Sequence, residues 1–145
     1  MFKHLLLPTD GSPLSEEALR KGVQFAKSAN AKVTGLYVMP EFHVFTYRTG
    51  MLESTPHAFV ADCKAHAAQY LGVVEQMARE AGVECDATSM TSDHPYQAII
   101  HAAEKHGCDL IAMASHGRSG VQGLLIGSQT QKVLTHSKIP VLVYR

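Results

Sequence analysis

The densest set of residues suited to chemistry lies between Ala114 and Ser128, in the run Ala-Ser-His-Gly-Arg-Ser-Gly-Val-Gln-Gly-Leu-Leu-Ile-Gly-Ser. It holds four of the chain's eleven glycines. Glycine backbones can approach a ligand closely, so successive N–H groups can converge on phosphate oxygens. The run therefore predicts a phosphate-binding loop. The same glycines can also simply shape a long connection between a strand and a helix.

The loop belongs to neither of the two commonest phosphate-binding kinds. A Walker A loop needs Gly-Lys-Ser/Thr after four intervening residues, and the Rossmann fingerprint normally follows the first strand. Thirteen basic residues balance thirteen acidic ones, so the chain lacks the broad positive field that nucleic-acid binding requires. We expect no nucleic-acid partner and a local phosphate site built largely from backbone groups.

Short apolar runs alternate with longer helical patterns along the chain, which indicates successive βα units and a parallel sheet covered on both faces. The expected strands are residues 3–8, 32–38, 83–90, 109–113 and 140–144. The expected helices are residues 13–29, 57–81, a segment following Pro95, and 128–136. Ser12-Pro13 is the expected N-cap and first residue of the first helix, and the Ser128 hydroxyl is the expected N-cap of the last. Residues 39–55 show no clean period and are expected to form a long loop.

The 57–81 helix is expected to carry its apolar residues at mostly helical spacing. They are Phe59, Val60, Ala67, Tyr70, Leu71, Val74 and Met77.

Right-handed crossovers between five such strands favour an open sheet of flavodoxin-like or related order. In such a sheet, ligands lie beyond the carboxyl ends of the strands that flank the switch point, here the first and the fourth. The loops 9–12 and 114–127 are therefore the expected site.

The segment Ser115-His116-Gly117, nine residues, then Gly127-Ser128 resembles the ATP-binding signature of universal stress proteins, Gly-x-x-Gly, nine residues, Gly-Ser/Thr. The likeness also covers residues 6–12, 109–113 and 139–144. It implies one domain over residues 1–145, with an α/β sheet of order 3-2-1-4-5 like that of the adenine nucleotide alpha hydrolases. Ala114 departs from the family, because it replaces the first loop glycine and adds a methyl near the expected nucleotide.

The resemblance also implies which residues contact the nucleotide. Pro8, Thr9, Val38, Met113 and Ala114 would surround the base and ribose, although ordinary packing at strand ends also explains the first three. Asp10 would accept a hydrogen bond from a ribose hydroxyl or help to hold a divalent ion, or it would instead cap the next helix. The residues expected at or beside the phosphates are Ser115, His116, Gly117, Arg118, Gly127, Ser128, Gln129 and Thr130.

Three functions remain open at this point. The first is a nucleotide-dependent binding and signalling module of the stress response, holding ATP with Mg²⁺ or Mn²⁺ bridging its phosphates. The second is a slow ATPase or phosphotransferase that uses His116, against which stands the absence of a Walker-type lysine and of paired carboxylates. The third is a nucleotide-free dimeric interaction protein, in which Ala114 and Gln129 close the pocket.

The remaining features concern setting and assembly. Cys63, Cys85 and Cys108 are odd in number and lack a CxxC pair, which fits a reducing cytoplasm better than a disulfide framework. The histidines lack metal-binding spacing, so no protein-built metal site is expected. No apolar run reaches the roughly 18 residues that span a bilayer, so no membrane anchor is expected. The strand from Pro140 to Tyr144 has apolar residues at both odd and even positions, so it would be hazardous as an exposed edge. The family commonly covers this strand by pairing it with the same strand of a second subunit, which implies a homodimer.

Overall fold

The central strand of the sheet is β1 (His4–Thr9), and all of its residues are buried. The computed structural model describes residues 1–41, 56–117 and 126–145. In it, β1 pairs with β2 (Lys32–Met39) and with β4 (Leu110–Ala114), while β3 (Cys85–Thr91) and β5 (Val141–Tyr144) form the edges. All pairings are parallel, and the order β3-β2-β1-β4-β5 confirms the expected topology.

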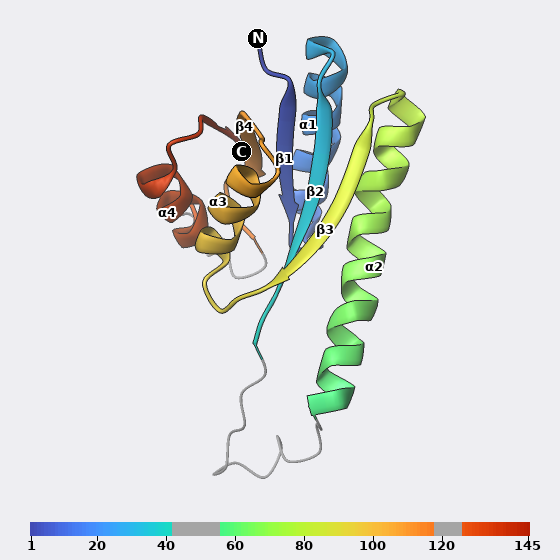
Figure 1. Ribbon diagram of the computed structural model, residues 1–145, viewed down its shortest axis with the longest axis vertical. Coiled ribbons are helices and arrows are strands. Elements are labelled where there is room, and N and C mark those ends of the chain that lie inside the picture. The colour runs from blue at the N-terminus through green and yellow to red at the C-terminus, as the bar shows by residue number, and fades with distance from the viewer. Residues whose placement is uncertain (42–55, 118–125) are drawn as a thin grey trace.

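Helices cover both faces of this sheet (Figure 1). α1 (Pro13–Ala29) and α2 (Pro56–Ala81) pack on one face, and α3 (Pro95–Lys105) and α4 (Ser128–His136) pack on the other. Leu5 and Leu7 of β1 belong to the first core, and Leu6 belongs to the second. A strand between two helical layers must be apolar on both faces, which is why the β1 sequence does not alternate.

The start of α1 confirms the expected capping signal. The hydroxyl of Ser12 accepts a hydrogen bond from the backbone N–H of Ser15 at 3.2 Å, and Pro13 is the first helical residue. The helix ends at Asn30, which adopts a left-handed φ of 53°. Both ends of α1 are thus fixed by local sequence.

α2 is longer than the sheet that it covers, and its first turns extend beyond the carboxyl edge of the strands (Figure 1). Val60, one of the apolar residues at helical spacing, is 45% exposed there. Further along, a side chain at Gly35 of β2 would lie 2.5 Å from Cγ1 of Val74, so glycine allows α2 to approach the sheet closely. This close approach brings the middle of α2 to the strand ends.

α4 begins at Ser128 as expected, but its cap differs from the expectation. Gly127 is the N-cap, with extended backbone at φ −69° and ψ 159°, and no side chain caps the helix. The prediction that the Ser128 hydroxyl caps α4 is therefore wrong, because Ser128 is already the first helical residue. Among the described residues, no helix has both the length and the apolar character needed to cross a membrane.

Candidate functional site

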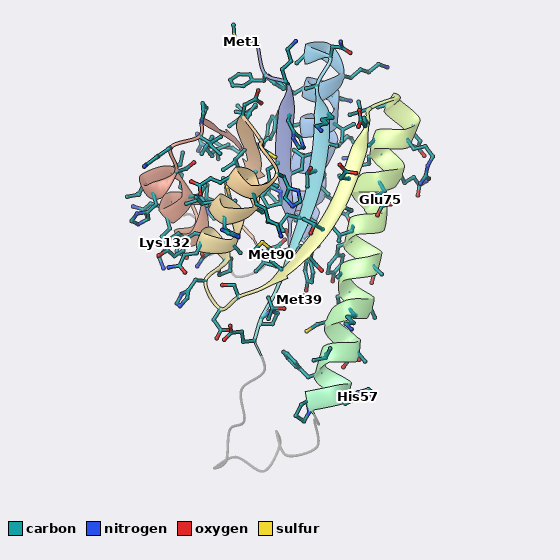
Figure 2. All side chains as sticks on the ribbon, in the orientation of Figure 1. Met1, Met39, His57, Glu75, Met90 and Lys132 are labelled. Carbon is teal, nitrogen blue, oxygen red and sulfur yellow. The ribbon has the colours of Figure 1, made fainter. Side chains whose placement is uncertain are left out.

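A cavity of about 650 Å³ opens at the carboxyl end of the sheet, where the strands end and the helices begin. Met39 and Met90, labelled in Figure 2, lie at this end of β2 and β3. The cavity brings together all the expected site residues except Ser115 and Arg118. Those that line it are Pro8, Thr9, Asp10, Val38, Met113, Ala114, His116, Gly117, Gly127, Ser128, Gln129 and Thr130. Ser115 is buried behind the lining, and Arg118 lies outside the described residues.

Asp10 lies between the turn into α1 and the glycine-rich loop. Its Oδ1 accepts a hydrogen bond from the backbone N–H of Ser12 at 2.9 Å, which fixes the turn into α1. Its other oxygen, Oδ2, faces Gly117 so closely that a side chain on Gly117 would overlap it. The carboxylate therefore shapes the turn and also joins the end of β1 to the glycine-rich loop.

Hydrogen bonds tie the described ends of the glycine-rich loop together. The N–H of Gly127 donates to the carbonyl of Ser115 at 2.7 Å, and the hydroxyl of Thr130 donates to the carbonyl of Ala114 at 2.9 Å. A Cβ on Gly127 would lie 3.0 Å from the Ser115 oxygen, which is a very tight contact. The first turn of α4 is thus held against the end of β4.

Neither Ala114 nor Gln129 closes the cavity. Among the described residues only Asn30 is a non-glycine with positive φ, so Ala114 adopts ordinary backbone. The side chain of Gln129 is turned toward α3, where its Oε1 accepts a hydrogen bond from the N–H of Tyr96 at 3.1 Å. The open cavity removes the specific reason for the nucleotide-free hypothesis.

His116 is held in place by Ser115, since its Nδ1 lies 3.0 Å from the Ser115 hydroxyl oxygen. Its Nε2 is shut off from solvent and has no hydrogen-bond partner in the described part of the chain. A buried Nε2 and an Nδ1 engaged by Ser115 do not fit a phosphate acceptor. Residues 1–41, 56–117 and 126–145 contain no group of three or more metal-ligating side chains that could hold an ion.

The electrostatics of the cavity come from polar backbone rather than from cationic side chains. No lysine or arginine is among the described residues that line it. Instead, the first turns of three helices contribute Ser15, Pro95 and Ser128 to the wall. Helix N-termini carry partial positive charge and free N–H groups, so this arrangement favours an anion.

Sequence reasoning missed part of the lining. The missed residues are Ser15, Tyr37, His66, Tyr70, Pro95 and Ile99. One signal was available, because His66 and Tyr70 are four apart and so share a helix face. Their meeting with Tyr37 depends on how α2 lies against β2, which the sequence pattern does not encode.

Known proteins resemble the chain over its full length. A family model for the universal stress protein family matches residues 1–145. Universal stress protein MJ0531 of Methanocaldococcus jannaschii is 32% identical over 145 residues, covering 100% of this chain and 83% of the relative. The solved structure of MJ0577 from the same organism has a TM-score of 0.82 at 27% identity and covers 99% of this chain and 95% of its own.

A further solved structure shares the fold at lower identity. It is a universal stress protein in complex with cAMP, with a TM-score of 0.70 at 23% identity, covering 99% of this chain and 97% of that one. Family model, relative and fold agree over the entire length. The chain belongs to the universal stress protein family.

Proposed function

We propose that this protein binds an adenine nucleotide, with ATP as the main ligand, in the cavity at the carboxyl end of the sheet. The observation that carries the proposal is the convergence of β1, β2, β4 and the start of α4 on one cavity of about 650 Å³. That volume falls within the range of small-molecule sites. The same fold holds cAMP in the universal stress protein solved with that ligand.

The phosphates would lie against the backbone at Gly117 and at Gly127 to Thr130. Gly127 is the N-cap of α4, and the N–H groups of the first turn, Ser128 to Thr130, have no partner within the helix. These groups and the helix dipole would stabilise the negative charge without a lysine. Arg118, outside the described residues, would add a cationic contact.

The nucleoside would lie across the ends of β1 and β2. Asp10 lies between the glycine-rich loop and the turn into α1, where its carboxylate would accept a hydrogen bond from a ribose hydroxyl. Pro8, Val38 and Met113 would provide the apolar surface around the sugar and base. A Mg²⁺ or Mn²⁺ ion would bind the phosphates directly, and Asp10 is the one carboxylate among the described lining residues that could assist it.

The proposed role is a nucleotide-dependent binding and signalling module of the stress response. Its subunits would form a homodimer through the strand from Pro140 to Tyr144, since β5 is an edge of the sheet and its residues are only half-buried. The three cysteines are free, as is usual in the reducing cytoplasm that we propose as its setting.

Bound nucleotide in the purified protein is the direct test of this proposal. Protein expressed without added nucleotide is denatured, and the released small molecules are separated by ion-exchange chromatography. We expect ATP or ADP at close to one per chain. Protein with no bound nucleotide and no uptake at millimolar ATP would contradict the proposal.

A measurement of phosphate release from ATP distinguishes a binding and signalling module from a slow ATPase. The buried Nε2 of His116 and the engaged Nδ1 argue against a phosphoryl-enzyme intermediate. We expect the ATP-loaded protein to retain its nucleotide over hours without phosphate release. Steady phosphate release that is lost in a variant with both Gly127→Val and Ser128→Leu would instead establish an ATPase.

A further inference from the structure

One side of the cavity is aromatic, and the proposed nucleotide contacts leave it unused. Tyr37 of β2 and the pair His66 and Tyr70 of α2 all line the cavity. The rings of Tyr37 and Tyr70 meet edge to face, with centroids 5.4 Å apart and planes at 61°. The ring of His66 stacks on Tyr70, with centroids 5.9 Å apart and planes at 17°. We call these three residues the aromatic wall.

The aromatic wall is fixed by the elements beneath it. Gly11, in the turn after β1, adopts a φ of +79°, and a side chain there would overlap the ring of Tyr70. The turn that carries Asp10 therefore packs directly on the aromatic wall. His66 lies one helical turn before Tyr70 on α2, so their stacking is set by the helix. A wall held in this way loses little conformational freedom when a ligand binds.

The order of the strands places the aromatic wall at the far end of a bound nucleotide. The phosphate-binding backbone follows β4, Asp10 follows β1, and Tyr37 lies near the end of β2. Neighbouring strands lie about 4.8 Å apart, so β2 is roughly 10 Å from β4. A ligand with phosphates at Gly127 and ribose at Asp10 therefore directs its base to the end of β2.

The space at the end of β2 has two different sides. The α2 side is the aromatic wall, and the α3 side is aliphatic, formed by Val38 and Ile99. A space lined by aromatic side chains on one side and aliphatic side chains on the other suits a heteroaromatic ring system. Contact between bases and aromatic side chains is tolerant of base identity, so discrimination comes from the area that the base covers.

We propose that Tyr37, His66 and Tyr70 form a base-recognition subsite that contacts the purine ring and favours purine over pyrimidine nucleotides. This inference rests on the proposed function, because it assumes that phosphates bind at the start of α4. It adds three contact residues and a selectivity that the glycine-rich loop cannot supply.

The test measures three ligands by calorimetry, each with magnesium: ATP, CTP and inorganic tripolyphosphate. The variants are His66→Ala and Tyr37→Leu, while Tyr70 is kept because it supports the Gly11 turn. The matched control is Tyr96→Leu, since the Tyr96 ring packs 5.4 Å from His136 and does not line the cavity.

We expect wild-type protein to bind ATP more tightly than CTP and more tightly than tripolyphosphate. Each aromatic-wall variant should weaken ATP about tenfold, which is within the range of base–aromatic contacts. The variants should bind tripolyphosphate as wild type does, which also shows that they are folded. The Tyr96→Leu control should bind all three ligands as wild type does.

Several results would overturn the subsite. ATP affinity that is unchanged in both variants, or tripolyphosphate affinity that falls in parallel with it, would show that the rings do not recognise the base. Wild-type protein that binds ATP no more tightly than tripolyphosphate would remove the subsite and leave the phosphate loop intact. Binding of neither ligand would remove the subsite and the proposed function together.

Discussion

The Cα of Gly117 faces the carboxylate of Asp10 so closely that any side chain at residue 117 would overlap Oδ2. This contact joins the end of β1 to the loop that follows β4, the two strands flanking the switch point of the sheet. It explains in steric terms why glycine stands at this place in the loop. It also makes the position of the carboxylate depend on the size of residue 117.

Replacing Gly117 with alanine should separate ligand affinity from stability. The atom that the new methyl meets is the far end of a flexible side chain, so Asp10 should rotate away while the backbone stays in place. Loss of a hydrogen bond to a charged group corresponds to a drop in ATP affinity of about tenfold or more. Calorimetry gives the affinity, and thermal unfolding should show only a small fall in Tm, caused by the disturbed bond between Asp10 and the Ser12 N–H.

The control for this variant is Gly72→Ala in α2. A methyl at Gly72 meets no heavy atom within 4 Å. Alanine in a helix is more favourable than glycine by about 0.5 to 1 kcal/mol, so this variant should be slightly more stable and bind ATP normally. Weakened ATP binding in the Gly72→Ala protein, or wild-type affinity in the Gly117→Ala protein, would contradict the account.

Thr130→Val tests the link between α4 and β4. The buried Thr130 hydroxyl donates to the Ala114 carbonyl at 2.9 Å, and valine keeps the shape but removes the donor. We expect a loss of about 1 to 2 kcal/mol in the free energy of unfolding. Urea denaturation measures it. Thr135→Val is the control, because that hydroxyl bonds the Gln131 carbonyl at 2.8 Å on the exposed face of α4 and should matter less.

His4 should make stability depend on pH. It is buried, with Nε2 2.7 Å from the Thr34 hydroxyl oxygen. Burial, reinforced by the Lys32 ammonium, lowers the pKa of His4 below 6.5, while the Asp109 carboxylate opposes the shift. The unfolded chain therefore takes up a proton near pH 6.5 that the folded protein does not bind until a lower pH. Stability should fall as the pH drops below 6.5 and show no His4 dependence above it.

His4→Gln isolates this effect, because glutamine can bond Thr34 but does not titrate. Urea unfolding at about pH 7.5 and about pH 5.5 gives the loss of stability for each protein. Wild type should lose more than the variant. Equal losses would show that His4 does not couple folding to protonation.

Features of the fold that depend on residues close together in the sequence could be predicted, and features that depend on contacts between distant elements could not. The unbroken apolar run of β1 and the Ser12-Pro13 signal reflect local requirements, and both elements formed as expected. The prediction that Ser128 caps α4 was wrong because Gly127 adopts the extended cap conformation instead. Helical periodicity also cannot show where α2 runs past the sheet and leaves Val60 exposed.

The residues of the candidate site also fall into a predictable group and an unpredictable group. The loop residues were predictable because they are close in sequence and match a family signature. The aromatic wall was not, since Tyr37 and Tyr70 meet only when α2 packs closely over Gly35. Residue spacing along one element predicts which side chains share a face, but it does not predict what that face meets.

Val143→Pro tests the proposed dimer. The N–H groups of β4 and of the residue after it donate to the carbonyls of Pro140 and Tyr144, so alternate residues of β5 bond inward and Val143 directs its N–H outward. Proline there should leave the monomer intact and block edge pairing. Light scattering should give twice 15.8 kDa for wild type and for a Val143→Thr control, and 15.8 kDa for Val143→Pro. A monomeric wild type would refute the dimer.

The central claim is that the glycine-rich loop and the start of α4 bind the phosphates of ATP. Calorimetric titration of nucleotide-stripped protein with ATP and magnesium tests it directly, alongside a variant with both Gly127→Val and Ser128→Leu. A side chain at residue 127 would meet the Ser115 carbonyl at 3.0 Å, so it should push the loop away from the start of α4, and leucine at residue 128 should take up space in the cavity lining. The account predicts saturable binding to wild type at close to one ATP per chain and none to the variant. Equal binding by both proteins, or no binding by wild type at millimolar ATP, would contradict it.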